Sequence, residues 1–480
     1  MAQTQDIVSK LWNLCNILKD DGVTYHEYVT ELTFLLFLKM ARETNKEDGL
    51  PKGYRWADLV KRDGVELLTF YKGLLLHLGT KTSGRIQEIF ADASTMVRQP
   101  KHLKELITQI ENIEWFEARE EGALADLYEG LLEKNASETK SGAGQYFTPR
   151  PLIDSMVAVM KPQPGETIHD PAAGTVGFII AADRYIKKQT KDLSTLTERE
   201  IRFQINEAYL GVELVPDTHR LALMNAMLHG LLSPILLADT MGGEGERIAR
   251  GQKADLILTN PPFGTKKGGG LPTRKDFTYP TSNKQFCFLQ HIYRSLAPGG
   301  RAAVVLPDNV LFEENTGAQI RADLMDKCDV HTILRLPTGI FYAQGVKTNV
   351  LFFTKGRTEK GNTKAVWVYD LRANMPAFGK RTPLTRDHFK AFEQAYGADP
   401  LGQAKRRDEG ETGRFRRFDR DFIRERGENL DIAWLKDDTA VSHLDLPPPQ
   451  TLVAAVQKQI AIAGTEMAAL GRDLKKGGAK

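Results

Sequence analysis

Apolar residues recur at helical spacing through the first part of the chain. The first such group is Ile7, Leu11, Leu14 and Leu18. The same spacing returns in four later stretches, Tyr28–Leu36, Val65–Leu78, His102–Ile110 and Gly122–Asn135. Steps of three and four place side chains on one face of a helix. Because no strand-like alternation interrupts these stretches, we predict an all-helical N-terminal domain over residues 1–135.

A different pattern follows the polar stretch that begins near residue 135. Short apolar runs alternate with amphipathic segments such as Pro216–His229 and Lys284–Leu296. The runs that predict strands are Thr167–His169, Tyr209–Glu213, Ile235–Ala238, Asp255–Thr259, Ala302–Leu306 and His331–Leu336. Alternating strands and helices are typical of an α/β fold with a doubly wound, mostly parallel sheet. We assign this sheet to residues 136–356.

One further apolar run, Thr348–Thr354, has no clear helix before it. A parallel neighbour needs a long crossover connection, whereas an antiparallel neighbour does not. We therefore expect this strand to pair antiparallel at the end of the sheet.

Residues 357–480 form a C-terminal extension that is polar and basic at first and becomes helical at its end. The final segment carries apolar residues at steps of four and three, namely Leu452, Val456, Ile460, Ala463, Met467, Leu470 and Leu474. Such a seam is typical of a coiled-coil helix. Two interpretations remain open: a helix that binds a partner chain, which the proline-rich entry Pro447–Pro449 favours, and a helix packed on its own domain.

Length and composition limit the possible classes of protein. The chain has 480 residues, which corresponds to about three domains, and 41% of them are hydrophobic. The net charge is only +3, so bulk charge does not attract nucleic acid, although a local basic cleft is compatible with this value. The three cysteines, Cys15, Cys287 and Cys328, have neither zinc nor disulfide spacing, so we expect reduced thiols and no metal site.

Targeting and membrane signals are missing from the sequence as read. The first twenty residues lack the basic start and apolar run of a secretory signal. The longest apolar stretch, near Leu35–Met40, is far shorter than the roughly 20 residues of a membrane-spanning helix. We therefore expect a cytoplasmic protein with no membrane partner.

The first candidate site is the glycine-rich segment Asp170–Phe178, which reads DPAAGTVGF. It follows a predicted strand and opens a predicted helix, whose unpaired N–H groups can receive a negative group. Glu213 ends the next strand, where a carboxylate can accept hydrogen bonds from two ribose hydroxyls. Asp239 ends the third strand and can bind an adenine amine, or equally can cap a helix.

The second candidate site is Asn260-Pro261-Pro262-Phe263, directly after the strand Asp255–Thr259. The prolines lack N–H donors, so the turn presents the Asn260 side-chain oxygen and the Pro261 carbonyl as acceptors. The Phe263 ring lies beside them. Two acceptors and a ring suit a planar substrate with an amino group, whose delocalised lone pair makes it a poor nucleophile. Methyl transfer to such a nitrogen requires positioning more than a strong base.

The third candidate segment reads QYFTPR and comprises Gln145, Tyr146, Phe147, Thr148, Pro149 and Arg150. Thr148 can cap the helix predicted over Pro151–Met160, and Pro149 suits its first turn. One interpretation is a loop that covers the amino-acid end of a cofactor. The other is simply the start of a helix.

The three motifs QYFTPRP, DPAAGTVGF and NPPF, in this order, resemble the γ group of amino-methyltransferases that act on adenine N6. More closely, nearly the whole chain resembles the modification subunit of type I restriction–modification systems. The resemblance implies a Rossmann-like, S-adenosylmethionine-dependent methyltransferase core. It also implies double-stranded DNA as substrate, a specificity subunit that chooses the target, a second copy of this chain and a restriction subunit as partners.

The resemblance also implies roles for individual residues. Asn260 to Phe263 hold the target adenine, with Phe341 or Tyr342 on its other face. The residues implied to contact the cofactor are Gln145, Tyr146, Phe147, Thr148, Pro149, Arg150, Asp170, Gly174, Thr175, Val176, Gly177, Glu213 and Asp239. Relatives often have glycine where this chain has Val176. Because valine does not adopt positive φ comfortably, we expect a slightly different turn there.

The glycine-rich segment Gly264–Pro280 contains Lys266, Lys267, Arg274 and Lys275. These charges can close over a DNA backbone, or the segment can be an ordinary solvated loop. Alternatives for the whole chain are a methyltransferase of the same chemistry that acts on protein glutamine or on guanine N2 of RNA, and a non-catalytic scaffold. The sequence has no G-x-x-x-x-G-K-[ST] motif, which argues against an ATP-driven motor.

Overall fold

A computed structural model of the chain provides the fold. It describes residues 2–19, 22–44, 47–113, 115, 123–138, 147–251, 253–264, 271–341, 346–376, 378–379, 382–436 and 457. The chain divides into two compact units. The first comprises residues 1–372 and 377–435, and the second comprises residues 373–376 and 436–480. All elements discussed below belong to the first unit, and the predicted C-terminal seam lies outside the described residues apart from position 457.

In the described part of the N-terminal region, all regular elements are helices, as predicted. They are α1 (Ala2–Asn13), α2 (Cys15–Lys19), α3 (Tyr25–Glu43), α4 (Trp56–Val60), α5 (Gly64–Lys81), α6 (Gly84–Phe90), α7 (Pro100–Glu111) and α8 (Ala123–Glu138), with a 3-10 turn at Glu47–Gly49. A capping box starts α3, in which Thr24 and Glu27 satisfy each other's backbone N–H groups. Leu67, Leu74 and Leu78 bury the inner face of α5, which explains the helical spacing in the sequence.

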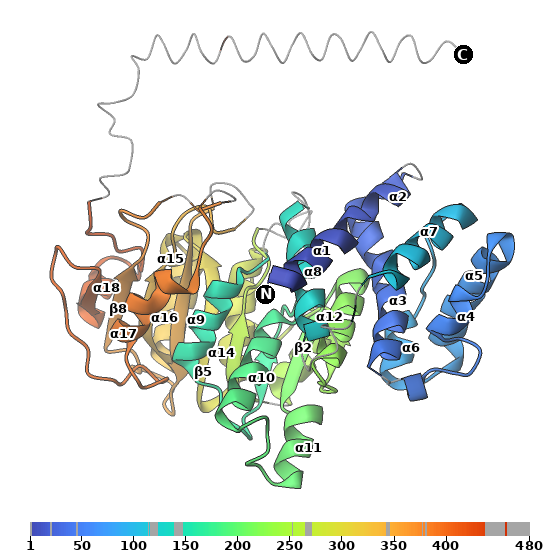
Figure 1. Cartoon of the computed structure of the whole chain (residues 1–480). Helices are drawn as coiled ribbons and strands as arrows, with labels where there is room; N and C mark the ends of the chain where they lie inside the picture. The colour runs from blue at the N-terminus through green and yellow to red at the C-terminus, as the bar shows by residue number, and fades with distance from the viewer. Residues whose placement is uncertain are drawn as a thin grey trace. The chain divides into compact units, whose positions relative to one another are not determined.

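In the described residues, a nine-stranded sheet follows, in the order β3-β2-β1-β4-β5-β7-β6-β8-β9. Figure 1 labels three of its strands, β2, β5 and β8. Its strands are β1 (Ile168–Asp170), β2 (Tyr209–Glu213), β3 (Ile235–Leu237), β4 (Ala254–Thr259), β5 (Leu296–Pro307), β6 (Cys328–Arg335), β7 (Thr348–Lys355), β8 (Ala365–Asp370) and β9 (Phe415–Asp419). Strands β1 to β5 are mutually parallel. The predicted α/β class and doubly wound sheet are confirmed.

Strand β7 is antiparallel to both of its neighbours, as expected, but its predicted place at the end of the sheet is wrong. It lies between β5 and β6, with Ala302 opposite Phe353 on one side and Ile333 opposite Leu351 on the other. The first six residues of β7 are buried on both faces of the sheet. A strand without an exposed face belongs in the interior of a sheet, which is what its continuous apolar run indicates.

The sheet does not end at residue 356. Strand β8 pairs parallel to β6, and β9 pairs antiparallel to β8. These two strands were not predicted. The residues of β9, FRRFD, are polar and basic, whereas the residues of β8, AVWVYD, are mainly apolar and were not singled out. The three-part division of the chain, with boundaries near residues 135 and 356, stays a prediction.

Ten helices, most of which pack on the sheet, follow α8 in the described residues. They are α9 (Arg150–Met160), α10 (Gly177–Gln189), α11 (Glu198–Asn206), α12 (Pro216–Leu228), α13 (Gly243–Arg250), α14 (Lys284–Ser295), α15 (Asn309–Phe312), α16 (Thr316–Lys327), α17 (Lys390–Tyr396) and α18 (Arg420–Glu425), with a 3-10 turn at Arg386–Phe389 before α17. The three cysteines are buried and form no disulfide with one another.

Both faces of the sheet are covered, as two consecutive residues of β7 show. Phe353 joins a buried apolar cluster with Leu289 of α14 and Leu324 of α16. The ring of Phe352 lies 5.4 Å from that of Tyr396 in α17. Because neighbouring side chains of a strand point to opposite faces, α14 and α16 cover one face and α17 covers the other. The carboxyl ends of the central strands are therefore held between two layers of helices.

Candidate active site at the carboxyl ends of the strands

Strands β1, β2 and β4 deliver three predicted site residues to the same edge of the sheet. Asp170 ends β1, Glu213 ends β2 and Asn260 directly follows β4. Asp170 is in register with Gly211 of β2, and Ile168 is in register with Leu256 of β4. Since these strands are parallel, their carboxyl ends share one edge, which is where ligands bind in open α/β sheets.

Asp170 is a buried carboxyl group that connects the ends of β1 and β4. Its Oδ1 accepts hydrogen bonds from the Thr259 hydroxyl at 2.7 Å and from the Ala172 backbone N–H at 3.1 Å. Burial raises the pKa of Asp170 to about 7, and the nearby charge of Glu213 contributes. The free energy of ionising this carboxyl is therefore sensitive to any positive charge that comes close to it.

Glu213 holds the glycine-rich turn against the end of β2. Its Oε2 accepts a hydrogen bond from the Gly174 N–H at 2.9 Å, and its Oε1 accepts one from Val215 at 2.8 Å. Burial raises its pKa. Each carboxylate oxygen can accept more than one hydrogen bond, so this arrangement is compatible with the predicted role of Glu213 toward ribose hydroxyls.

Val176 was expected to avoid positive φ because its side chain is β-branched, and this expectation is wrong. It adopts φ +60° and ψ +28° as the N-cap of α10, and it is fully buried. Gly174 in the same turn has φ +53°. The turn therefore contains two left-handed residues, one of which is β-branched. Such a conformation costs about 1–3 kcal/mol and persists only where the surroundings impose it.

Contacts within the turn and with α12 supply that constraint. The Val176 N–H donates to the Ala173 carbonyl at 2.7 Å. The Asn225 side chain of α12 donates to the Thr175 carbonyl at 2.9 Å. Gly177 then begins α10, so the predicted helix N-terminus lies directly after the turn. Asn225 was not singled out in the sequence, since no motif marks it.

Residues Phe147 to Arg150 of the QYFTPR motif are described by the structure, whereas Gln145 and Tyr146 lie outside the described residues. The N-cap of α9 is Pro149, so Thr148 does not cap this helix. Instead, the Thr148 hydroxyl accepts a hydrogen bond of 2.9 Å from Asn260 Nδ2. This contact connects the QYFTPR motif to the NPPF motif through two residues that are 112 positions apart in the chain.

Arg150 connects the same segment to α8 and α10. Its guanidinium forms an ion pair with Glu129 of α8 and donates to the Gly177 carbonyl at 3.3 Å. Arg184 of α10 also pairs with Glu129, at 3.1 Å. Burial, together with the like charge of Arg184, lowers the pKa of Arg150 to about 10. Glu129 is buried and lies in the helical N-terminal region, where sequence reasoning offered no signal for it.

The NPPF motif leaves the sheet directly at the end of β4. Pro261 is buried, Pro262 is exposed, and Asn260 and Phe263 are half-buried. The Phe263 ring lies 6.4 Å from the Phe341 ring, with 71° between their planes. Phe341, one of the two aromatic residues considered for the second face of the base, is therefore next to the motif. Tyr342, the other, is outside the described residues.

Asp239 lies in a turn after β3 rather than at a helix N-cap, which is Gly242. Its Oδ1 accepts a hydrogen bond from the Met241 N–H at 2.8 Å. The next residue, Thr240, donates its hydroxyl to the Pro171 carbonyl at 2.6 Å. The turn after β3 is thereby attached to the glycine-rich turn after β1.

Arg274, in the basic loop that follows NPPF, fits neither the expected DNA contact nor the expected solvated loop. Arg274 is buried and forms a bidentate ion pair with Asp276, so it is not placed to contact DNA phosphates. Lys275 is exposed, and Lys266 and Lys267 lie outside the described residues. Burial of an arginine requires a partner for its charge, and the sequence did not reveal that Asp276 would be this partner.

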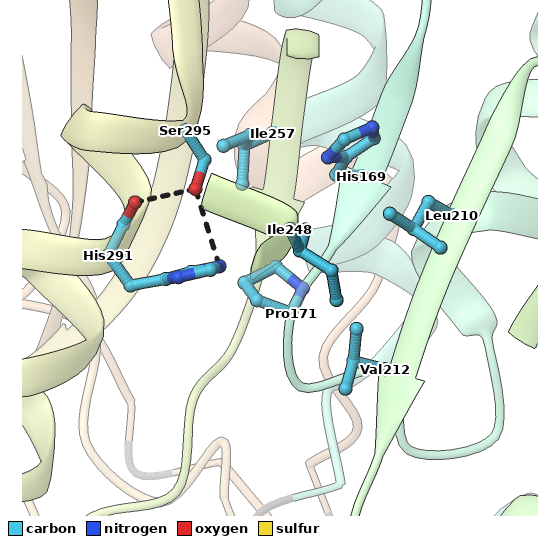
Figure 2. Close-up of a pocket in the computed structure, with 8 residues that line it drawn as sticks. All are labelled: His169, Pro171, Leu210, Val212, Ile248, Ile257, His291 and Ser295. Atoms are coloured by element: carbon cyan, nitrogen blue, oxygen red, sulfur yellow. Dashed lines mark hydrogen bonds between the residues drawn. The ribbon is translucent and has the colours of Figure 1, made fainter. Parts of the chain in front are cut away.

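A small cavity lies behind the glycine-rich turn, between the sheet and helices α13 and α14 (Figure 2). It is lined by His169, Pro171, Leu210, Val212, Ile248, Ile257, His291 and Ser295. Burial lowers the pKa of His169 to about 4 and that of His291 well below its usual value, so both rings are neutral. The lining is mainly apolar, and only Pro171 belongs to a predicted motif.

Among the residues that the structure describes, no group of three or more His, Cys, Asp or Glu side chains is placed to hold a metal ion. No helix found there has both the length and the apolar character needed to cross a membrane.

Comparison with known proteins identifies the class that this fold and site define. The N-6 DNA Methylase family matches residues 119–443, and the HsdM N-terminal domain matches residues 7–110. The type I restriction enzyme StySPI methylase subunit of Salmonella potsdam is 50% identical, over 98% of this chain and 96% of its own.

Solved structures agree with these matches. The crystal structure of the type I restriction enzyme EcoKI M protein is 46% identical, covers 98% of this chain and 96% of its own, and has a TM-score of 0.58. A structure from work on complex assembly and conformational transition of the type I R-M system is 26% identical, covers 98% of both chains, and has a TM-score of 0.69. The chain therefore belongs to the methylase subunits of type I restriction enzymes, within the adenine-N6 DNA methyltransferases.

Proposed function

We propose that the chain binds S-adenosylmethionine at the ends of β1, β2 and β3 and transfers its methyl group to an adenine held by the NPPF motif. The observation that carries this assignment is the hydrogen bond between Asn260 Nδ2 and Thr148 Oγ1. It joins the segment predicted to cover the cofactor to the segment predicted to hold the base. Donor and acceptor sites must meet at such a point for direct transfer.

The residues at the donor side suit this cofactor. Glu213 lies where the ribose hydroxyls would bind, and Asp239 lies at the adenine end. Asp170 is a buried carboxyl whose pKa is raised to about 7, so a cation beside it gains a favourable charge interaction. The sulfonium and ammonium groups of S-adenosylmethionine are both cations. When bound, the donor supplies an electrophilic methyl group.

On the base side, the chain's own groups orient the nucleophile. Asn260 Nδ2 is engaged with Thr148, which fixes the plane of the amide and the direction of Oδ1. Oδ1 and the Pro261 carbonyl would accept the two N6 hydrogens and hold the nitrogen toward the methyl group. Phe263 would stack on the base, with Phe341 beside it. Removing an adenine from the duplex costs a few kcal/mol, roughly, which stacking and hydrogen bonding offset.

Partners follow from the family. The chain would act as the modification subunit of a complex in which a specificity subunit chooses the DNA sequence and a restriction subunit is added for cleavage. A second copy of the chain would complete the methylating assembly in the cytoplasm. The apolar seam from Leu452 to Leu474 is our candidate for the contact with the specificity subunit, although the structure does not describe it.

Thr148 provides the direct test of the site. Thr148→Val removes the hydroxyl with little change of volume, and Thr148→Ser retains it. In the complex with its specificity subunit, Thr148→Val should lower the rate of adenine methylation about tenfold, as expected for one lost positioning hydrogen bond. Thr148→Ser should restore most of the rate. The readout is N6-methyladenine in target DNA, measured by mass spectrometry after reaction with labelled donor.

Two results would contradict the assignment. Equal rates for Thr148→Val and the wild type would show that the contact with Asn260 is not used. Label that appears in RNA or in protein glutamine, and not in DNA, would show that the methyltransferase acts on a different substrate by the same chemistry.

A further inference from the structure

The loop between β4 and α14 returns close to its starting point. It leaves the NPPF motif at Gly264, whose carbonyl accepts a hydrogen bond from the Lys284 N–H at 3.1 Å. Asn283 caps α14 by accepting from the Gln285 N–H at 3.0 Å. The loop is therefore attached at its base to the motif that is proposed to hold the target adenine. Its described part, residues 271–283, includes the buried Arg274.

Arg274 is tightly surrounded by polar and aromatic groups. Its Nε and Nη2 donate to the two carboxylate oxygens of Asp276, at 2.8 and 2.6 Å. Its Nη1 contacts His291 Nδ1 at 2.6 Å, and its guanidinium lies 4.3 Å from the centre of the Phe277 ring. His291 is neutral, since burial and the Arg274 charge lower its pKa, so Nδ1 can accept the hydrogen bond. The arginine charge is thus paired inside the protein.

Arg274 also forms a hydrogen bond with the turn after β3. Its Nη1 donates to the Thr240 carbonyl at 3.1 Å. Thr240 follows Asp239 in the turn after β3, and the Thr240 hydroxyl donates to the Pro171 carbonyl of the glycine-rich turn. Thr240 is therefore attached at one end to the turn after β1 and at the other end to the loop after β4. Both of these segments carry predicted site residues.

We propose that Arg274 is a positioning residue that couples the donor-binding turn after β3 to the loop that follows the target-base motif. This inference rests on the proposed function of the two sites. Arg274 would therefore contribute to donor affinity rather than bind DNA phosphates. A guanidinium suits this role because its planar fork can serve Asp276, Thr240 and His291 together, which a lysine ammonium cannot do in the same geometry.

The effect of Arg274 on donor binding can be measured. Loss of the bond to Thr240 would release the carbonyl next to Asp239, and the adenine end of the donor would bind to a less ordered turn. Donor binding would weaken even without DNA. DNA affinity and its dependence on salt would not change, because Arg274 is buried and already paired with Asp276.

The experiment compares Arg274→Gln, Arg274→Lys and Lys275→Gln in the full chain with its specificity subunit. Lys275 is the matched control, since it is the next residue, carries the same charge and is exposed. Calorimetry without DNA gives the Kd for S-adenosylmethionine, steady-state kinetics separate the donor KM from kcat, and titrations at several salt concentrations give the DNA-binding slope.

We expect Arg274→Gln to raise the donor Kd and donor KM roughly tenfold or more, as for the loss of hydrogen bonds from a charged group. Arg274→Lys should fall between this variant and the wild type, and the salt slope should stay unchanged in both. Lys275→Gln should leave the donor Kd unchanged. An unchanged donor Kd together with a shallower salt slope in Arg274→Gln would overturn the proposal in favour of a DNA contact.

Folding is controlled by a second variant. Thr240→Val keeps the backbone carbonyl that Arg274 binds but removes the hydroxyl bond to Pro171, and it should also raise the donor Kd. Arg274→Gln and Thr240→Val could lower the melting temperature and still bind the donor with the wild-type Kd at temperatures at which they are folded. That result would show that Arg274 has only a structural role. If the wild type itself binds no S-adenosylmethionine, the proposed donor site fails, which is a distinguishable outcome.

Discussion

The two halves of the site differ in the kind of polar group that they present. The donor half, at the ends of β1 to β3, presents the carboxylates Asp170, Glu213 and Asp239, each held by backbone N–H groups. The base half, after β4, presents an amide, two prolines and the ring of Phe263. The donor is a cation and adenine is neutral, so negative charge is useful in only one half. With the proposed function, this edge of the sheet would therefore separate the recognition of a charged donor from the orientation of a neutral base.

Removal of the Asn260 amide should have the largest effect and should be confined to the base half. Asn260→Ala should lower the methylation rate by a factor on the order of 10² to 10³, as for loss of a preorganised hydrogen-bonding group at the reacting atom. Donor Kd should stay within about twofold, because Asn260 does not belong to the donor half. Asn206→Ala, at an exposed asparagine of α11, is the control for a surface amide. A higher donor Kd in Asn260→Ala would show that the donor half and the base half are not separate.

Neutralising Glu213 should produce the opposite signature. Glu213→Gln keeps the shape but removes the charge and weakens the bonds from Gly174 and Val215. Donor KM and Kd should rise about tenfold with kcat nearly unchanged at saturating donor, since hydrogen bonds to a charged group contribute about 1.5–3 kcal/mol. Glu207→Gln, an exposed neighbour, should behave as the wild type. A fall in kcat with constant KM would contradict this assignment.

Asp170 should make donor binding and stability depend on pH. Its pKa is about 7 in the folded chain and about 3.9 when unfolded. The folded state therefore binds the proton more tightly, so this contribution to stability is full below about pH 4 and is lost as pH rises through about 7. A cationic donor favours the ionised form, so donor affinity should rise with pH toward about 7 and then level off.

Calorimetry in buffers of different ionisation enthalpy measures the proton released on donor binding below pH 7. Asp170→Asn should abolish most of that release and flatten the change of unfolding free energy between about pH 4 and 7. A variant that retains the full pH dependence of the wild type would assign the titration to another group.

Val176→Gly should have the smallest effect. Glycine removes strain of about 1–3 kcal/mol at positive φ, but burial of the valine side chain is lost, which contributes about 1.5–3 kcal/mol. The free energy of unfolding in urea should therefore change by about 1 kcal/mol or less. Val157 is a buried valine in regular α9, where no strain is relieved, so Val157→Gly should cost about 2–4 kcal/mol. Equal losses in both variants would show that the turn at Val176 is unstrained.

Local patterns predicted much of the fold and the order of the site. Seven of the strands and the helical N-terminal region follow from the spacing of apolar residues, because burial on one face or both imposes that spacing. The motifs also indicated that Asp170, Glu213 and Asn260 follow strands, and parallel pairing then places them on one edge. The continuous apolar run of β7 is typical of an interior strand, but its particular place between β5 and β6 was not predictable from its own residues. It depends on which neighbours supply the pairing partners.

The sequence by itself determined the class of the protein and the strands that carry the two motifs, and it predicted the chemistry of these motifs. Only the tertiary structure decided that Thr148 bonds to Asn260, that Val176 takes a left-handed conformation and that Arg274 is buried. The reason is that spacing and turn chemistry are local properties, whereas the bond of Thr148 to Asn260 and the bonds of Arg274 to Thr240 and His291 join residues far apart in the chain. Arg274 looks like a DNA contact until Asp276, Thr240 and His291 are seen to surround it.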